Sequence, residues 1–126
     1  IISASHDRTV REWDWEAGVC TRVVLESNQL WGISAMHLHT ETGTISLGHV
    51  NGVVEVRAPR QTRALSSAGW PHGEVTGKMA PAHGVWDCVW SYRHGLDGSR
   101  AFSAPTPEVA SVQHDGDKVI SVARTG

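Results

Sequence analysis

The sequence predicts an all-β protein made of short antiparallel strands. Apolar and polar residues alternate over short runs such as Thr44–Gly48 and Val53–Val56, and Gly or Asn residues bound these runs. The chain also repeats itself, because Ile2–His6 aligns with Ile45–His49. Turn residues follow one another too closely to leave a window for a stable amphipathic helix.

The chain divides into units that follow one another in sequence. The first, residues 1–25, supplies three strands. The second, residues 31–65, supplies strands separated by turns that contain Gly. These strands are Ile33–Leu38, Thr44–Gly48 and Val53–Val56.

The second half of the chain allows two registers. In the preferred one, residues 66–82 are an inserted loop rich in Gly and Pro, and residues 83–126 are a third unit that opens with a strand at Val85–Trp90. In the other, Val109–Ser121 forms the first two strands of a new unit, and residues 70–107 are an extra segment.

Composition indicates a soluble globular protein. Of the 126 residues, 40% are hydrophobic and 19% are charged, and the net charge is −2. Lys and Arg form no group longer than that in Arg57–Arg63, which argues against a general nucleic-acid surface. No apolar run approaches the roughly 18 residues of a membrane span, so we expect no membrane role.

The two cysteines, Cys20 and Cys88, lie far apart in the sequence, within predicted strands. Such cysteines are most often buried, reduced thiols of intracellular proteins. We therefore expect a cytoplasmic or nuclear protein without disulfides.

The opening stretch carries the most specific pattern of the chain. Ser5-x-Asp7, followed six residues later by Trp13-Asp14, resembles the structural tetrad of the WD-repeat family. In that family a strand Ser or Thr, a turn Asp, a strand Trp and a His from the preceding loop share one hydrogen-bonded network. Trp only donates and Asp only accepts, so these groups can satisfy one another.

The resemblance implies a partial WD-repeat β-propeller, an open arc of about three blades, each an antiparallel four-stranded sheet. The His partner of the first unit would precede Ile1, so we expect a fragment of a longer protein. The later units depart from the pattern. The second has Val50 at the Asp position, and the third keeps His83 but has Pro107 at the Asp position.

No pattern predicts catalysis, a cofactor or a metal site. His37 and His39 project to one face of a strand, but a zinc site needs three or four ligands and no spacing pattern supplies the others. Gly73–Met79 is one residue shorter than a phosphate loop and ends in Met where a hydroxyl is required. We therefore expect a protein that is not an enzyme.

The resemblance implies a non-catalytic scaffold that binds other proteins or peptides within a multiprotein complex. Ligands of WD-repeat proteins commonly dock on the inter-blade loops and on the turns between second and third strands. Here these segments are His6–Arg8, Glu26–Trp31, His49–Gly52 and Ser66–Gly84. Substrate recognition in a ubiquitin ligase and a role in a ribonucleoprotein or signalling assembly stay open as narrower functions. For the tryptophans, packing between blades is the favoured role, and an exposed anchor for a partner is the alternative. The candidate partner-binding residues are His6, Arg8, Trp31, His49, Asn51, Trp70 and Trp86.

Overall fold

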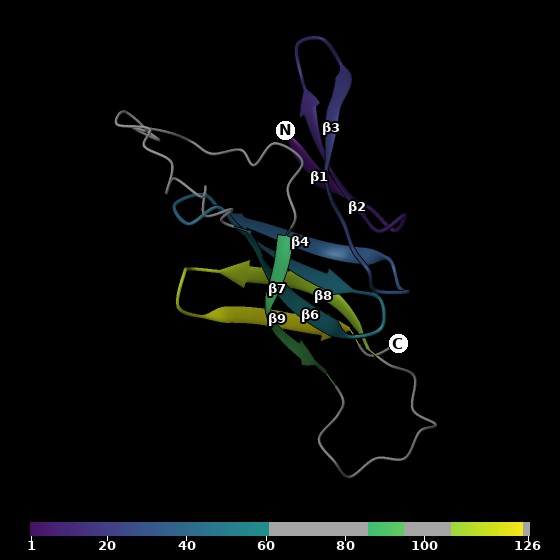
Figure 1. Ribbon diagram of the computed structural model, residues 1–126. Helices are drawn as coiled ribbons and strands as arrows, with labels where there is room; N and C mark the ends of the chain where they lie inside the picture. Colours follow the sequence, from purple (N-terminus) through teal and green to yellow (C-terminus); the bar gives the residue numbers. More distant parts are fainter. Residues whose placement is uncertain (61–85, 95–106, 125–126) are drawn as a thin grey trace, which may run out of the picture.

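The computed structural model describes residues 1–60, 86–94 and 107–124, and the regular elements in these ranges are all antiparallel β-strands (Figure 1). The predicted all-β class is confirmed for this part of the chain. Three sheets form, with strand orders β1-β2-β3, β4-β5-β6-β7 and β8-β9. The strands are β1 (Ile2–Ala4), β2 (Thr9–Asp14), β3 (Val19–Glu26), β4 (Ile33–His39), β5 (Thr44–His49), β6 (Val53–Pro59), β7 (Trp86–Arg93), β8 (Glu108–His114) and β9 (Val119–Arg124).

Aspartate side chains fix both turns of the first sheet. Between β1 and β2, Asp7 Oδ1 accepts hydrogen bonds from the backbone N of Thr9 at 2.9 Å and from its Oγ1 at 2.6 Å. Between β2 and β3, Asp14 Oδ1 accepts from the backbone N of Glu16 at 2.9 Å. Such bonds to the backbone two residues on explain why Asp favours turns.

The four-stranded sheet lies between the other two and packs on both faces. Because alternate residues of a strand point to opposite faces, a short run can contribute to two separate cores. The larger core joins this sheet to the first and contains Val10, Val24, Leu25, Ile33, Ile45 and Leu47. The smaller core joins it to β8 and contains Val54, Val109 and Val112.

The pairing of β7 differs from the preferred register of the second half of the chain. The strand predicted at Val85–Trp90 was expected to open a third unit, but β7 is the fourth strand of the middle sheet, with Trp90 opposite Val56 of β6. Residues 108–124 instead form a separate hairpin, as in the alternative register. The alternation of residues in a strand does not specify which strand it pairs with. Here β7 pairs with the edge of β6 that β5 does not occupy. The predicted loop at residues 66–82 lies outside the described residues.

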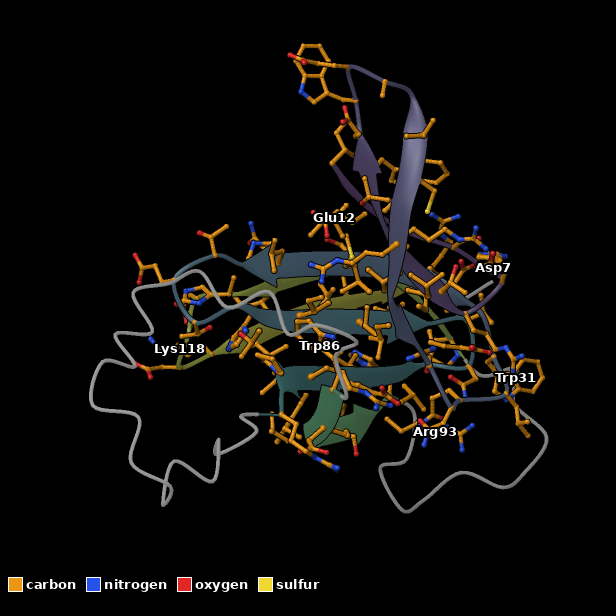
Figure 2. All side chains as sticks on the ribbon, turned by 45° about the horizontal axis from the view of Figure 1, so that its top comes forward. Asp7, Glu12, Trp31, Trp86, Arg93 and Lys118 are labelled. Atoms are coloured by element: carbon orange, nitrogen blue, oxygen red, sulfur yellow. The ribbon has the colours of Figure 1, made fainter. Side chains whose placement is uncertain are left out.

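Connections between strands lie at two opposite ends of the sheets. We call one the loop end, formed by residues 5–8, 27–32 and 50–52, and the other the turn end, formed by residues 15–18, 40–43 and 115–118. Figure 2 shows Asp7, Trp31 and Arg93 on the side of the loop end, and Lys118 on the opposite side.

Candidate interaction surface

The connection from β3 to β4 presents two large apolar side chains at the loop end. The residue exposure is 86% for Leu30 and 53% for Trp31. Apolar side chains that stay this exposed contribute only part of their possible burial free energy to the stability of the fold, because much of their surface remains in water. They therefore mark this connection as a candidate interaction surface.

Backbone hydrogen bonds hold this connection against its neighbours on both sides. At its start, Ser27 N donates to Arg8 O at 2.9 Å, which ties it to the β1–β2 turn. At its end, the Gly32 carbonyl accepts from Val50 N at 3.1 Å, which ties it to the β5–β6 turn. Three separate segments of the loop end thus form one continuous surface.

Gly32 permits a close crossing within that surface. A Cβ atom built on Gly32 would lie 2.7 Å from both the Cα and the carbonyl O of His6. No other L-amino acid fits at that distance without displacement of backbone, because the atoms opposed are themselves main chain. The sequence analysis did not single out this glycine.

A buried polar cluster lies beneath the connection. Glu55 and His49 are fully buried, and Arg57 is nearly so. Arg57 Nε donates to Glu55 Oε2 at 2.8 Å, and His49 Nε2 lies 3.9 Å from the same oxygen. Burial acts to raise the pKa of Glu55, but the nearby His49 ring, together with the hydrogen bond and the charge of Arg57, lowers it to about 2. Glu55 is therefore ionised at neutral pH.

The tetrad residues expected from the sequence are arranged differently. Trp13 Nε1 donates to Ser3 Oγ at 2.8 Å, and not to Ser5 as expected, while Ser5 Oγ accepts from Asp7 N at 3.2 Å. The register explains the change: Trp13 pairs with Ile1 through the backbone, so Ser3 is its diagonal neighbour and Ser5 lies too far along the strand. The Asp7 carboxylate bonds to Thr9 and also to Arg11, at 3.1 Å.

The predicted partner-binding residues separate into three groups. His6, Arg8 and Trp31 lie together at the loop end. His49 and Asn51 are also there, but both are buried. A side chain without exposed surface cannot contact a partner, so these two support the surface from below.

Of the two further candidates, the one that the structure describes does not join that surface. Trp86 pairs with Pro59, at the strand end remote from Asn51, and packs against the larger core. Trp70 and the Ser66–Gly84 loop lie outside the described residues. Leu30 was not named singly by the sequence analysis, although it lies within the segment Glu26–Trp31 that was expected on the binding face.

The histidines of β4 meet the hairpin at the turn end. The His39 and His114 rings have centroids 5.4 Å apart, and His114 N donates to His37 Nδ1 at 3.2 Å. Even so, the part of the chain that the structure describes holds no group of three His, Cys, Asp or Glu residues able to bind a metal ion.

The prediction that both cysteines are buried is wrong. Cys20 and Cys88 are free, but both are exposed and not buried. Cys20 lies near the tip of the β2–β3 hairpin, and Cys88 lies on β7 at the edge of its sheet, where few side chains can cover them. Among the described residues there is no helix long and apolar enough to cross a membrane.

No family model, curated protein or solved structure matches this chain. The geometry of the loop end is therefore the basis for assigning a function.

Proposed function

We propose that this chain is a non-catalytic interaction scaffold, part of a WD-repeat β-propeller, whose loop end binds another protein or a peptide. The observation that carries the proposal is the exposure of Leu30 and Trp31 on a connection fixed by backbone bonds at both of its ends. Trp is enriched among residues that dominate binding energies. A connection already held in place loses little conformational entropy on binding.

The stacking of sheets supports the propeller part of the proposal. A four-stranded antiparallel meander packed on each face by a neighbouring sheet is the arrangement expected of consecutive blades. The contact between Trp13 and Ser3 supports it as well, because it joins a strand Trp to a strand Ser across one sheet.

The proposal is tested by comparing two exposed tryptophans in quantitative affinity capture from cell extract. Trp31→Ala removes the aromatic side chain at the loop end, whereas Trp15→Ala removes one that is 71% exposed at the turn end. We expect Trp31→Ala to lower the recovery of specific partners and Trp15→Ala to leave it unchanged. Both variants should unfold at the wild-type denaturant midpoint, since neither side chain is buried.

Equal recovery by the wild-type chain and by Trp31→Ala, repeated with Leu30→Ser, would show that the loop end is not the binding surface. A loss caused by Trp15→Ala alone would move the binding surface to the turn end and contradict the proposal.

A further inference from the structure

The buried cluster contacts the β3–β4 connection at both sides of Leu30. On one side, Arg57 Nη2 donates to Asn28 Oδ1 at 2.7 Å. On the other, His49 Nδ1 lies 3.2 Å from the Trp31 carbonyl oxygen. Since a carbonyl oxygen only accepts, this nitrogen is the donor. The exposed segment is therefore bonded to one buried cluster at two points.

We propose that His49, Glu55 and Arg57 form a positioning bracket that holds the Leu30–Trp31 segment in its binding conformation. The inference deepens the function proposed above and rests on it for the role of the segment in binding. The bracket runs from Asn28 through the three buried side chains to the Trp31 carbonyl.

Glu55 is the centre of the bracket because both of its neighbours lie beside its carboxylate. Its Oε2 accepts from Arg57 Nε at 2.8 Å and lies 2.8 Å from Arg57 Nη2, which also donates to Asn28. His49 donates through Nδ1 to the loop, and its Nε2 lies 3.9 Å from the same carboxylate oxygen. The carboxylate thus holds the Arg57 guanidinium in place toward Asn28 and lies against the second side chain that contacts the loop.

A role in stability alone would not require a buried ion pair such as that of Glu55 and Arg57. Replacing a buried ion pair by well-packed apolar residues is often neutral or stabilising, so a buried charge cluster is weak evidence for a role in stability. Arg57 also donates to the Trp86 carbonyl, at 3.4 Å, which anchors the guanidinium to β7. Arg57 therefore links the β3–β4 connection to both β6 and β7 of the middle sheet.

The experiment measures amide exchange by NMR on the free protein, so it needs no partner. Reporter amides are Gln29, which donates to Ser27 Oγ, and Val50, which donates to the Gly32 carbonyl. The reference is the amide of Val112, in the smaller core. We expect Asn28→Ala to accelerate exchange at the reporters about 10-fold and to leave the reference unchanged, because a hydrogen bond to a charged group is lost locally.

Two further variants sharpen the test. Arg57→Lys keeps the charge beside Glu55 but has no fork to reach Asn28 at the same time, so it should reproduce the effect of Asn28→Ala. Gln29→Ala changes the same connection outside the bracket and should leave exchange at Val50 unchanged. Asn28 is exposed, so its replacement leaves the buried pair intact and the protein folded.

Unchanged exchange at both reporters in Asn28→Ala and Arg57→Lys would overturn the bracket. Equal acceleration at the Val112 reference would also overturn it, because the cluster would then stabilise the whole fold and not the loop. If exchange responds as expected but Trp31→Ala does not affect capture, the bracket stands and the proposed binding function fails. If both stand, Asn28→Ala should weaken capture of the partners that depend on Trp31.

Discussion

Replacing Gly48 by alanine should push β8 away from the middle sheet and destabilise the protein. A Cβ atom on residue 48 would lie 2.4 Å from Val109 Cγ1 and 2.8 Å from Val109 Cβ. Rotation about χ1 can move the Cγ1 atom, but it cannot move Cβ. The backbone of β8 must therefore shift by roughly 1 Å to restore an ordinary carbon–carbon contact of about 3.5–4.0 Å.

The structure limits how easily that shift can occur. Ser34 Oγ donates to the Val109 carbonyl at 2.7 Å, and this bond from β4 holds the β8 backbone in place. Inserting a methyl group into a packed core costs about 1–3 kcal/mol. Alanine in a strand interior regains about 0.5–1 kcal/mol of the backbone entropy that glycine loses. The two ranges combine to about 0–2.5 kcal/mol, and the net expectation is a destabilisation of about 1 kcal/mol.

Urea denaturation of the wild type, Gly48→Ala, Val109→Ala and the double variant measures this coupling. The double variant should be more stable than the sum of the single effects predicts, since Val109→Ala makes room for the new methyl group. Additive effects, or a Gly48→Ala variant as stable as the wild type, would refute the packing argument.

Three other predictions concern single contacts. Trp13→Phe and Ser3→Ala should each lower the free energy of unfolding by about 0.5–1.5 kcal/mol through loss of one hydrogen bond, and urea denaturation should show that the two effects do not add. Ser34→Ala should cost about 1 kcal/mol by the same assay and reduce the effect of Gly48→Ala, because the β8 backbone is then free to move. The stability due to Glu55 should be fully present above pH 4.5 and lost as the pH falls toward 2, because the folded-state pKa of about 2 lies below the ordinary value of 4.5. The Arg57 guanidinium beside the carboxylate supports this sign, and acid titration of Glu55→Gln should lack that part of the stability change.

Local chemistry made several features of the site predictable. Asp7 was placed at a turn because an Asp side chain bonds to backbone groups only two residues away, as it does with Thr9. Trp31 was named as a candidate anchor because it lies where a loop enters a strand and because Trp is frequent among residues that dominate binding energies. In both cases the signal lies within a few residues of sequence.

The partners of distant residues were not predictable in this way. The sequence placed His49 and Asn51 on an exposed turn, but both are buried, His49 against the Trp31 carbonyl and Asn51 beside Arg93 of β7. It placed Trp13 beside Ser5, because spacing along one strand does not define the register with the next. The positions of Glu55 and Arg57 in the sequence gave no sign that the two side chains form a buried pair that bonds to Asn28.

The sequence alone therefore determined the strands, their turns and the all-β class, because alternation and turn chemistry act between near neighbours. Tertiary structure alone decided that β7 joins β6, that β8 packs over Gly48, and which loop-end side chains reach solvent. Those outcomes depend on contacts between segments far apart in the chain. Such contacts depend on how whole sheets pack, which no local pattern encodes.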